Sequence, residues 1–507
     1  MIKFNSNPAL SITYVGFGQG GTRIVDVFAS LKALNGQPYY KTYGLNSTKN
    51  DFSELKHIPR NNLVSLELNG FGKDPSEAID VLSMDENSQK KIEDFVDELY
   101  NQEDDLIIFC AGLGGGTGTS TIVKTLETYI AKYVTPKLDF VLTQLLEQQD
   151  LTKEDFNALP TKDQNRAKLQ AMEFALKANL IKKVGIIAAL PVRSDGPNTL
   201  AQVNKFSNYL WELAKNPLKG IAFVTFPDNQ KFYDEFTENK SKITQKTYRD
   251  YANSRIAEVF HELNLGTNMS GTDITFDPKD FRKVMLEGEG CLNVNRMTAS
   301  TNGISSEKDM YKLVIDSFNG SLLHDPIALQ SKENNEMVQQ LVHNVGILTV
   351  VNDDINSKDI SSAYLDDAKN HLSETLSLNG SIFTGHVNIS KTSFTTVAYT
   401  FYKSNGLPER LSKGLVEELE EYKKRKGSIK FLDDKIKQAS GMGNSRNLDA
   451  IKEVSLEGSL GSGSSLSFLK KAKDSASNAE NKQEPAALGS DSNLDFLKKL
   501  KKIDFNK

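Results

Sequence analysis

The chain has 507 residues, of which 38% are hydrophobic and 25% charged, as is ordinary for a globular protein of more than one domain. A net charge of −5 argues against a protein that binds polyanions over its whole surface. Two cysteines form no disulfide framework and no metal-ligand spacing, which favours a cytoplasmic protein without a metal held by side chains. There is no signal-peptide pattern and no apolar run near ~18 residues, so no membrane association is expected.

The first glycine-rich stretch follows a strand expected over residues 12–15 and precedes a helix expected over residues 22–34. It reads Gly-Phe-Gly-Gln-Gly-Gly at 16–21 and matches G-x-G-x-x-G, so a Rossmann dinucleotide site is one interpretation. That fingerprint requires an acidic residue after the second strand to bind the ribose. Here residues 46–49 are Asn-Ser-Thr-Lys, and the first acid is Asp51. The Rossmann alternative is therefore disfavoured.

A second glycine-rich stretch, Ala-Gly-Leu-Gly-Gly-Gly-Thr-Gly-Thr-Ser at 111–120, lies between a buried strand at 106–110 and a helix starting near residue 122. Glycines let the backbone approach a ligand closely, and the following helix presents unpaired N–H groups and a positive dipole end. The pattern predicts a phosphate-binding loop. No Gly-Lys-Ser/Thr closes the run, so it is not a Walker A loop.

The rest of the first half alternates strands and helices. Apolar strands are expected at 184–190 and 221–226, which favours a parallel α/β sheet. The polar stretch at 136–182 predicts an extra helical element without recognisable chemistry. A long amphipathic helix is expected at 248–265.

The second half predicts a smaller α+β unit with strands at 345–351, 381–387 and 394–401 and a helix at 361–377. A charged helix follows at roughly 409–426. Beyond residue 441 the composition shifts to Gly, Ser, Asn and Lys, which is typical of a disordered tail.

The Gly-Gly-Gly-Thr-Gly-Thr run resembles the signature of the tubulin/FtsZ family of GTP-dependent polymerising proteins. The glycines at 18–21 look like the family's first loop, Leu-Asn-Ser at 45–47 like its second, and residues 69–75 like its third. The TubZ branch, found on large plasmids and some phages, is the most similar. Features favouring it are Pro-Asp-Asn-Gln-Lys-Phe-Tyr from 227, His-Glu-Leu-Asn at 261–264, Gly-Leu-Pro-Glu-Arg at 406–410 and a tail with Leu-x-Phe-Leu-Lys-Lys.

The resemblance covers about residues 10–430 without the 136–182 segment, which looks like an insertion. It implies a parallel-sheet GTP-binding domain, a long central helix, a smaller α+β activation domain, a C-terminal helix and a flexible tail. The expected bounds of these five parts are 1–245, 246–266, 267–405, 406–440 and 441–507.

The resemblance also implies residues that bind GTP or GDP with Mg²⁺. The phosphate-binding set is Gln19, Gly20, Gly21, Asn46, Gly114, Gly115, Gly116, Thr117, Gly118 and Thr119. Asp195 is expected to bind a ribose hydroxyl, with a helix cap as the alternative. Asn229 and Asn253 are expected to bind the guanine edge, because an amide both donates and accepts. Tyr248 or Tyr251 is expected to stack on the base, or else to pack in the core.

Asp277 and Asp280 match the acidic pair of the family's catalytic loop, which reaches the γ-phosphate of a neighbouring subunit. A carboxylate there can orient the attacking water. Thr275 replaces the family's usual Asn, which leaves one contact to the water in doubt. The alternative is an Asp-Pro helix start with Asp280 in its first turn.

The resemblance predicts head-to-tail self-assembly into filaments that move plasmid or phage DNA through a DNA-bound adaptor. The tail repeats Leu-x-Phe-Leu-Lys-Lys at 466–471 and 494–499, which suits multivalent docking to that adaptor; direct DNA contact by the lysines is the alternative. A second alternative is a phage tubulin that positions phage DNA, or a scaffold of the cell-division type.

Overall fold

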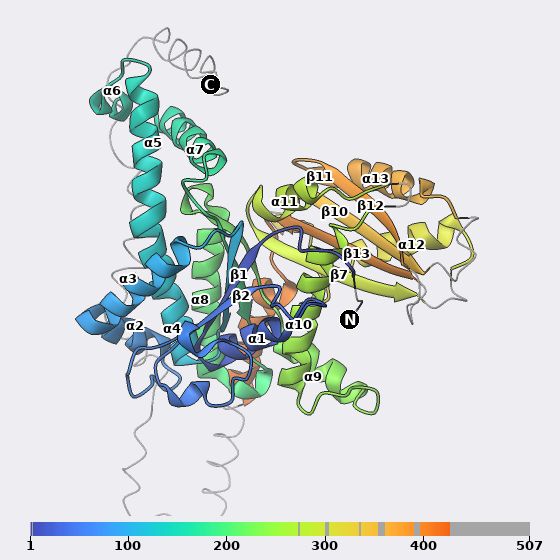
Figure 1. Ribbon diagram of the computed structural model, residues 1–507, viewed down its shortest axis with the longest axis horizontal. Helices are drawn as coiled ribbons and strands as arrows, with labels where there is room; N and C mark the ends of the chain where they lie inside the picture. Colours follow the sequence, from blue (N-terminus) through green and yellow to red (C-terminus); the bar gives the residue numbers. More distant parts are fainter. Residues whose placement is uncertain are drawn as a thin grey trace, which may run out of the picture.

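The computed structural model describes residue 2 and residues 4–271, 274–299, 304–333, 336–352, 360–389 and 396–425 (Figure 1). The expected tail at 441–507 and the last part of the expected C-terminal helix lie outside the described residues. None of the helices in the described part is both long and apolar enough to cross a membrane.

The first half of the chain alternates strands with helices, as the apolar runs predict. Its elements are β1 (Ile12–Phe17), α1 (Gly18–Ser30), β2 (Lys41–Asn46), β3 (Leu63–Ser65), α2 (Pro75–Met84), α3 (Glu86–Tyr100), β4 (Leu106–Gly112), α4 (Gly116–Tyr129), α5 (Thr135–Glu147), α6 (Lys153–Asn157), α7 (Thr161–Lys177), β5 (Val184–Ala189), α8 (Pro197–Lys215), β6 (Ile221–Thr225) and α9 (Asn229–Glu238).

The second half begins with the central helix α10 (Tyr248–Gly266), close to its expected bounds. It continues with α11 (Pro278–Leu286), β7 (Cys291–Ala299), α12 (Glu307–Phe318), β8 (Gln330–Glu333), β9 (Glu336–Gln339), β10 (Leu341–Asn352), α13 (Ala363–Thr375), β11 (Ser377–Leu378), β12 (Ile382–Ile389) and β13 (Thr396–Ser404). A π-helical turn at Arg410–Gly414 then leads into helix over 415–425.

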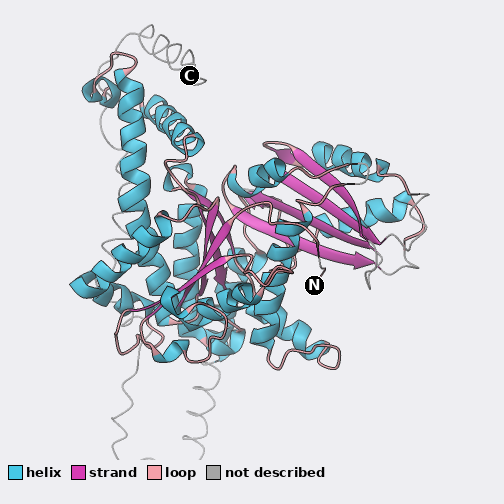
Figure 2. Ribbon diagram, viewed as in Figure 1, coloured by secondary structure: helices cyan, strands magenta, loops and turns pink. Residues whose placement is uncertain are grey.

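One 11-stranded sheet runs through both halves in the order β11-β10-β13-β7-β6-β5-β4-β1-β2-β3, with β12 beside β10. Strands β1 to β6 pair in parallel, whereas β13 is antiparallel to both β7 and β10. The halves join where β6 pairs with β7 through the single register pair Val224 and Cys291. Helices cover both faces of the sheet (Figure 2).

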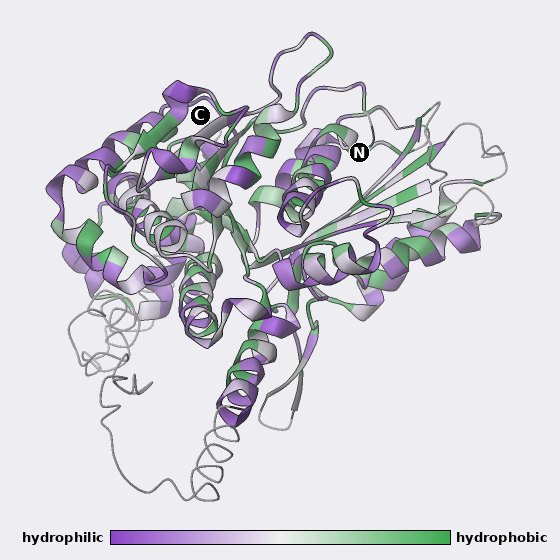
Figure 3. Ribbon diagram, turned by 90° about the horizontal axis from the view of Figure 1, so that it is seen from below, coloured by the Kyte–Doolittle hydropathy of each residue, from purple (hydrophilic) through white to green (hydrophobic). Residues whose placement is uncertain are grey.

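The central helix packs into a core that belongs to both halves of the chain. Ile256 and Phe260 of α10 share a buried cluster with Ile24 of α1 and with Leu348 and Phe401 of the second half. Figure 3 shows apolar residues gathered in the strands and hydrophilic residues on the outer helices. Because this core is shared, α10 fixes the position of one half against the other.

Both expected bounds of the first helix are wrong. Helix α1 begins at Gly18, not residue 22, because the glycines of the loop themselves form its first turn, and it ends at Ser30, not residue 34.

The 136–182 segment forms three helices, and its first helix continues α4 through a π-helical turn at Ile130–Val134. Proline lacks an N–H group, so the π turn before Pro136 lets the helix continue past that missing donor.

Candidate functional site

The two glycine-rich loops place two helix N-termini at one edge of the sheet. Strands β1 and β4 are parallel neighbours, α1 begins directly after β1, and α4 begins shortly after β4. The N-cap residues Phe17 and Gly115 make no side-chain cap. Uncapped N–H groups and two positive dipole ends therefore converge at the carboxyl ends of these strands, which is a ready site for phosphate.

Backbone packing explains the glycines of the two loops. A Cβ on Gly21 would lie 2.0 Å from the Cys110 carbonyl oxygen. At Gly18, where φ is +62°, it would lie 2.6 Å from the Gly118 nitrogen. At Gly115, by contrast, it would meet nothing within 4 Å. The loops thus touch through their backbones and leave open space beside Gly115.

Asn46 lies at the end of β2 with its side chain fully buried. Its Oδ1 accepts a hydrogen bond from the Ser47 N–H at 2.8 Å. Its Nδ2 is buried and has no partner within the described chain. A buried donor without a partner is costly, so this amide fits a ligand that brings an acceptor. The neighbouring Ser47 hydroxyl lies 3.2 Å from that of Thr117.

The other predicted phosphate-binding residues differ in whether their donor groups already make hydrogen bonds within the chain. Gln19 and Gly20 are exposed at the start of α1. The Gly116 N–H donates to the Gly72 carbonyl at 3.2 Å, and the Thr119 hydroxyl donates to the Leu113 carbonyl at 3.2 Å. Thr117 is half-buried, so it is the threonine whose hydroxyl lies on the accessible side of the loop.

The residues expected to bind ribose and base follow the next two strands of the sheet. Asp195 is in the short turn after β5, with its carboxylate 3.9 Å from the Lys73 ammonium group. The helix-cap alternative for Asp195 is wrong: the N-cap of α8 is Gly196, which makes no side-chain cap. Asn229 opens α9 and Asn253 lies in α10, and both are half-buried.

The rings of Tyr251 and Tyr248, the two candidates for stacking on the base, pack against different neighbours. Tyr251 packs against Phe232, with 6.1 Å between ring centroids, and donates to Glu235 at 3.2 Å. The Tyr248 ring contacts Tyr233 edge-on at 5.3 Å. Burial raises the pKa of Tyr248, and the Arg249 guanidinium, 4.7 Å from the centre of the ring, opposes that shift.

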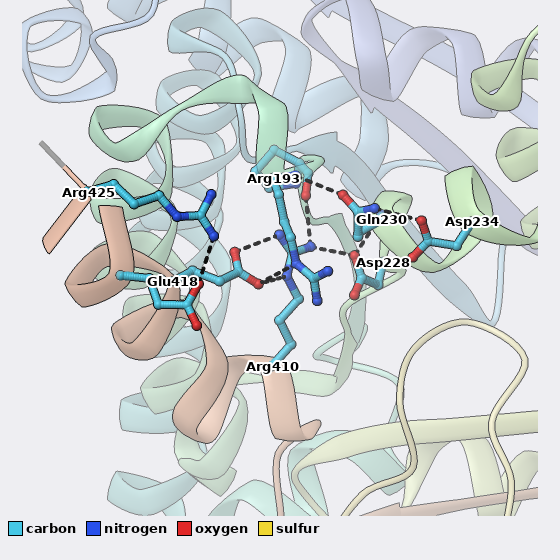
Figure 4. Close-up of polar contacts among 9 residues, drawn as sticks. Arg193, Asp228, Gln230, Asp234, Arg410, Glu418 and Arg425 are labelled. Carbon is cyan, nitrogen blue, oxygen red and sulfur yellow. Dashed lines mark hydrogen bonds and ion pairs between the residues drawn. The ribbon is translucent and has the colours of Figure 1, made fainter. Parts of the chain in front are cut away.

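The C-terminal helix is anchored to this part of the site by Arg410, to which the sequence alone assigned no role beyond its place in Gly-Leu-Pro-Glu-Arg (Figure 4). Its buried guanidinium donates to the Pro191 carbonyl at 2.8 Å, to the Asp228 carboxylate, and to Glu418 at 3.1 Å. Burial raises the pKa of Asp228, and Arg410 opposes that shift. Asp228 also caps α9 through the Gln230 N–H at 2.8 Å. Arg410 therefore holds together the turns that carry Asp195 and Asn229.

The predicted catalytic pair lies elsewhere. Asp277 is the N-cap of α11 and accepts from the Lys279 N–H at 2.7 Å, while Asp280 pairs with Lys283 at 3.2 Å. The local structure is thus the Asp-Pro helix start given as the alternative, and it leaves the Asp280 carboxylate partly exposed.

Helix α11 packs at the amino-terminal edge of the parallel strands. Its Arg282 forms an ion pair with Asp105, the residue before β4, and its Leu286 carbonyl accepts from Lys183, the residue before β5, at 2.6 Å. The glycine loop follows the other end of β4, about 23 Å away at ~3.3 Å per residue. Within one chain the structure does not bring the acidic pair to the phosphate loops.

Comparisons with known proteins point in one direction. No protein-family profile matches the chain. The tubulin-like protein TubZ of Bacillus cereus is 22% identical over 317 residues, which cover 61% of this chain and 60% of that relative's length.

Solved structures share the fold. The GTPγS-form protofilament of TubZ from Bacillus thuringiensis serovar israelensis has a TM-score of 0.58 and 16% identity, covering 86% of this chain and 97% of that one. A TubZ described as a type III plasmid segregation protein has a TM-score of 0.54 and 16% identity, covering 83% and 95% of the two chains. The chain is thus similar in sequence to TubZ and shares the fold of TubZ structures, in agreement with its glycine signature and sheet order.

Proposed function

We propose that the chain is a GTPase that assembles head to tail and hydrolyses GTP where one copy meets the next. The observation that supports this most strongly is the placement of the phosphate loops and the Asp280 carboxylate at opposite edges of one sheet. Copies stacked along the strand direction would bring the α11 edge of one copy over the phosphate loops of the next. A site divided in this way is complete only in an assembly.

The residues around the phosphate loops fit a guanine nucleotide. Backbone N–H groups at the starts of α1 and α4 would bind the phosphates, together with Gln19 and the Thr117 hydroxyl. The unpaired Asn46 amide would donate to a phosphate or sugar oxygen. Asp195 would bind the ribose, and Asn229 and Asn253 the guanine edge. Mg²⁺, bound through phosphate oxygens, would offset negative charge that develops during hydrolysis.

The neighbour's acidic pair would act on water. Asp280 is partly exposed and would orient the attacking water and accept its proton. Asp277 would hold the start of α11, and so Asp280, in place, because its own carboxylate caps the helix. A cytoplasmic location belongs to this proposal.

Assembly should depend on GTP. We expect light scattering to rise when GTP and Mg²⁺ are added to the purified chain, and to stay flat with ATP or NAD. Electron microscopy of the same sample should show filaments. Flat scattering across micromolar protein with GTP would contradict the proposed assembly, and tight binding of NAD without GTP binding would favour the Rossmann alternative.

We further propose that the filaments move DNA through an adaptor bound by the tail. Two observations support this: the repeated Leu-x-Phe-Leu-Lys-Lys unit of the sequence, and the plasmid-segregation description of one structural relative. Two linked copies of a weak docking unit gain affinity through effective concentration.

Removing residues 459–507 should leave hydrolysis and assembly unchanged and abolish co-sedimentation with an adaptor–DNA complex. Replacing Phe468 and Phe496 with alanine should weaken that interaction more than neutralising the lysines, because the phenylalanines are the apolar anchors. If the lysine changes weaken binding more, and binding to bare DNA falls steeply with salt, the tail contacts DNA directly.

A further inference from the structure

The helical hairpin formed by α5, α6 and α7 extends the molecule beyond the sheet. Helix α5 continues α4, so one helical run extends from residue 116 to residue 147. At ~1.5 Å per residue it is about 48 Å long, whereas β4 beside it spans about 23 Å. Figure 1 shows α5 and α7 standing clear of the strands, with α6 at the tip. About half of this helical run therefore lies beyond the sheet edge.

The hairpin projects from the same edge that carries α11. A helix that starts at the phosphate loop and runs antiparallel to β4 must leave the sheet at its amino-terminal edge. A cavity of about 1210 Å³ lies between the base of the hairpin and α11, lined by Glu173 and Lys177 on one side and by Lys279 and Arg282 on the other. The hairpin and α11 thus form two walls of one recess.

One face of α7 combines cations with an apolar side chain. Lys162, Arg166 and Leu169 succeed one another at intervals of four and three residues, so they share a face, and all three are exposed. They line a hollow together with Asp163 and Asn165. The opposite face of α7 carries the buried Ala167 and Ala171, and α7 packs against α5, so the charged face points away from the hairpin core.

Helix α2, at the other end of the molecule, carries a similar pattern with a charge of the opposite sign. Glu77, Val81 and Met84 follow the same four-and-three spacing and are exposed, and Met84 is 82% exposed. The helix starts beside the phosphate loop, where the Gly72 carbonyl accepts from the Gly116 N–H. Helix α2 packs against α4, the helix that α5 continues. The cationic face of α7 and the acidic face of α2 therefore lie on the same flank, at opposite ends.

We propose that α7 of one copy docks on α2 of the next copy, with Leu169 against Met84 and Lys162 near Glu77. This rests on the proposed head-to-tail assembly and adds to it a contact that only a chain with this hairpin can make. Stacking places the edge with α11 against the edge with the phosphate loops. The hairpin, which passes beyond the first edge, then overlaps the flank of the neighbour where α2 lies. Isolated exposed apolar residues are common on protein surfaces, so Leu169 and Met84 alone would not indicate an interface. Here the apolar residue and a charged residue of opposite sign follow the same spacing on both helices.

The contact can be tested by cross-linking between copies. A chain carrying Leu169→Cys is mixed with a longer, tagged chain carrying Met84→Cys, and a short bismaleimide is added with GTP and Mg²⁺. Cys110 and Cys291 are buried, and burial raises the pKa of both thiols, so neither competes. The control replaces Met84→Cys with Leu34→Cys, because Leu34 is 95% exposed in the turn after α1, away from α2.

We expect a cross-linked pair for 169 with 84 and none for 169 with 34, while light scattering reports assembly in both mixtures. Lys162→Glu should raise the protein concentration needed for assembly, and Glu77→Lys in the same chain should restore it. Assembly without the 169–84 product would overturn the docking contact and leave the proposed GTPase standing. If scattering shows no assembly, the result contradicts the proposed function itself, and not only the docking contact. Assembly that improves when Leu169→Asp is introduced would show that the hairpin obstructs stacking.

Discussion

We expect the Asp280→Ala chain to bind GTP with unchanged affinity and to hydrolyse it roughly 10²–10⁴-fold more slowly, the range that a positioned general base supplies. A substitution of Asp280 is easier to interpret than a substitution of Asp277. Among the described residues the Asp280 carboxylate pairs with exposed Lys283, whereas Asp277 caps α11 and its loss would also cost about 1 kcal/mol of helix stability. The measurement is phosphate release, with nucleotide affinity determined separately. Asp367→Ala, on the exposed face of α13, is the matched control and should hydrolyse GTP normally.

The same experiment distinguishes a shared site from a site within one chain. If Asp280 serves the neighbour's nucleotide, turnover per subunit should rise with protein concentration and fall towards zero on dilution. Filaments of the Asp280→Ala chain should persist, because their nucleotide stays unhydrolysed. Turnover that stays constant on dilution would rule out a shared site, and so would full activity of the Asp280→Ala chain.

The sequence predicted the parallel half of the fold well, because buried parallel strands consist of continuous runs of apolar residues. Strands β4, β5 and β6 lie where those runs are. It missed β7, whose residues Asn293, Asn295 and Arg296 interrupt the apolar pattern. Asn293 and Asn295 are buried because their amides donate to the carbonyls of Gly320 and Ser317, contacts that no local pattern indicates. It also gave no sign that a single register pair between β6 and β7 joins the two halves into one sheet.

The phosphate loops could be found from sequence because glycine spacing is local, and the loop backbones do pack as that spacing suggests. The anchoring role of Arg410 could not be found in this way, although the residue ends the Gly-Leu-Pro-Glu-Arg run. Its partners Pro191 and Asp228 are roughly two hundred residues away, and an arginine in a charged helix looks like a surface residue until those partners are placed. The proposed role of the cationic face of α7 could not be predicted for a similar reason, because it depends on α2 of another copy.

Replacing Glu262 with alanine should destabilise the folded chain by about 3–5 kcal/mol, the cost of leaving a buried ion without its partner. Glu262 lies in the buried second half of α10 with no exposed surface. Its carboxylate is 2.8 Å from the Arg296 guanidinium of β7 and accepts from the Tyr399 hydroxyl of β13 at 2.7 Å. It also accepts from the Ile2 N–H. The midpoint of urea unfolding is the measurement, and the exposed pair Glu212 with Lys215 supplies the control.

Glu212→Ala should shift the midpoint little, because exposed pairs contribute about 0–1 kcal/mol. Adding Arg296→Met to Glu262→Ala should recover much of the loss, since the cost lies in the uncompensated guanidinium rather than in the missing attraction. If Glu262→Ala unfolds at the normal midpoint, then the guanidinium has found water or another partner. In that case α10 is held to the second half by its apolar face alone. If the loss is as large as expected, the network fixes the central helix against β7 and β13. It then also sets the position of α11, which follows α10 in the chain and carries Asp280.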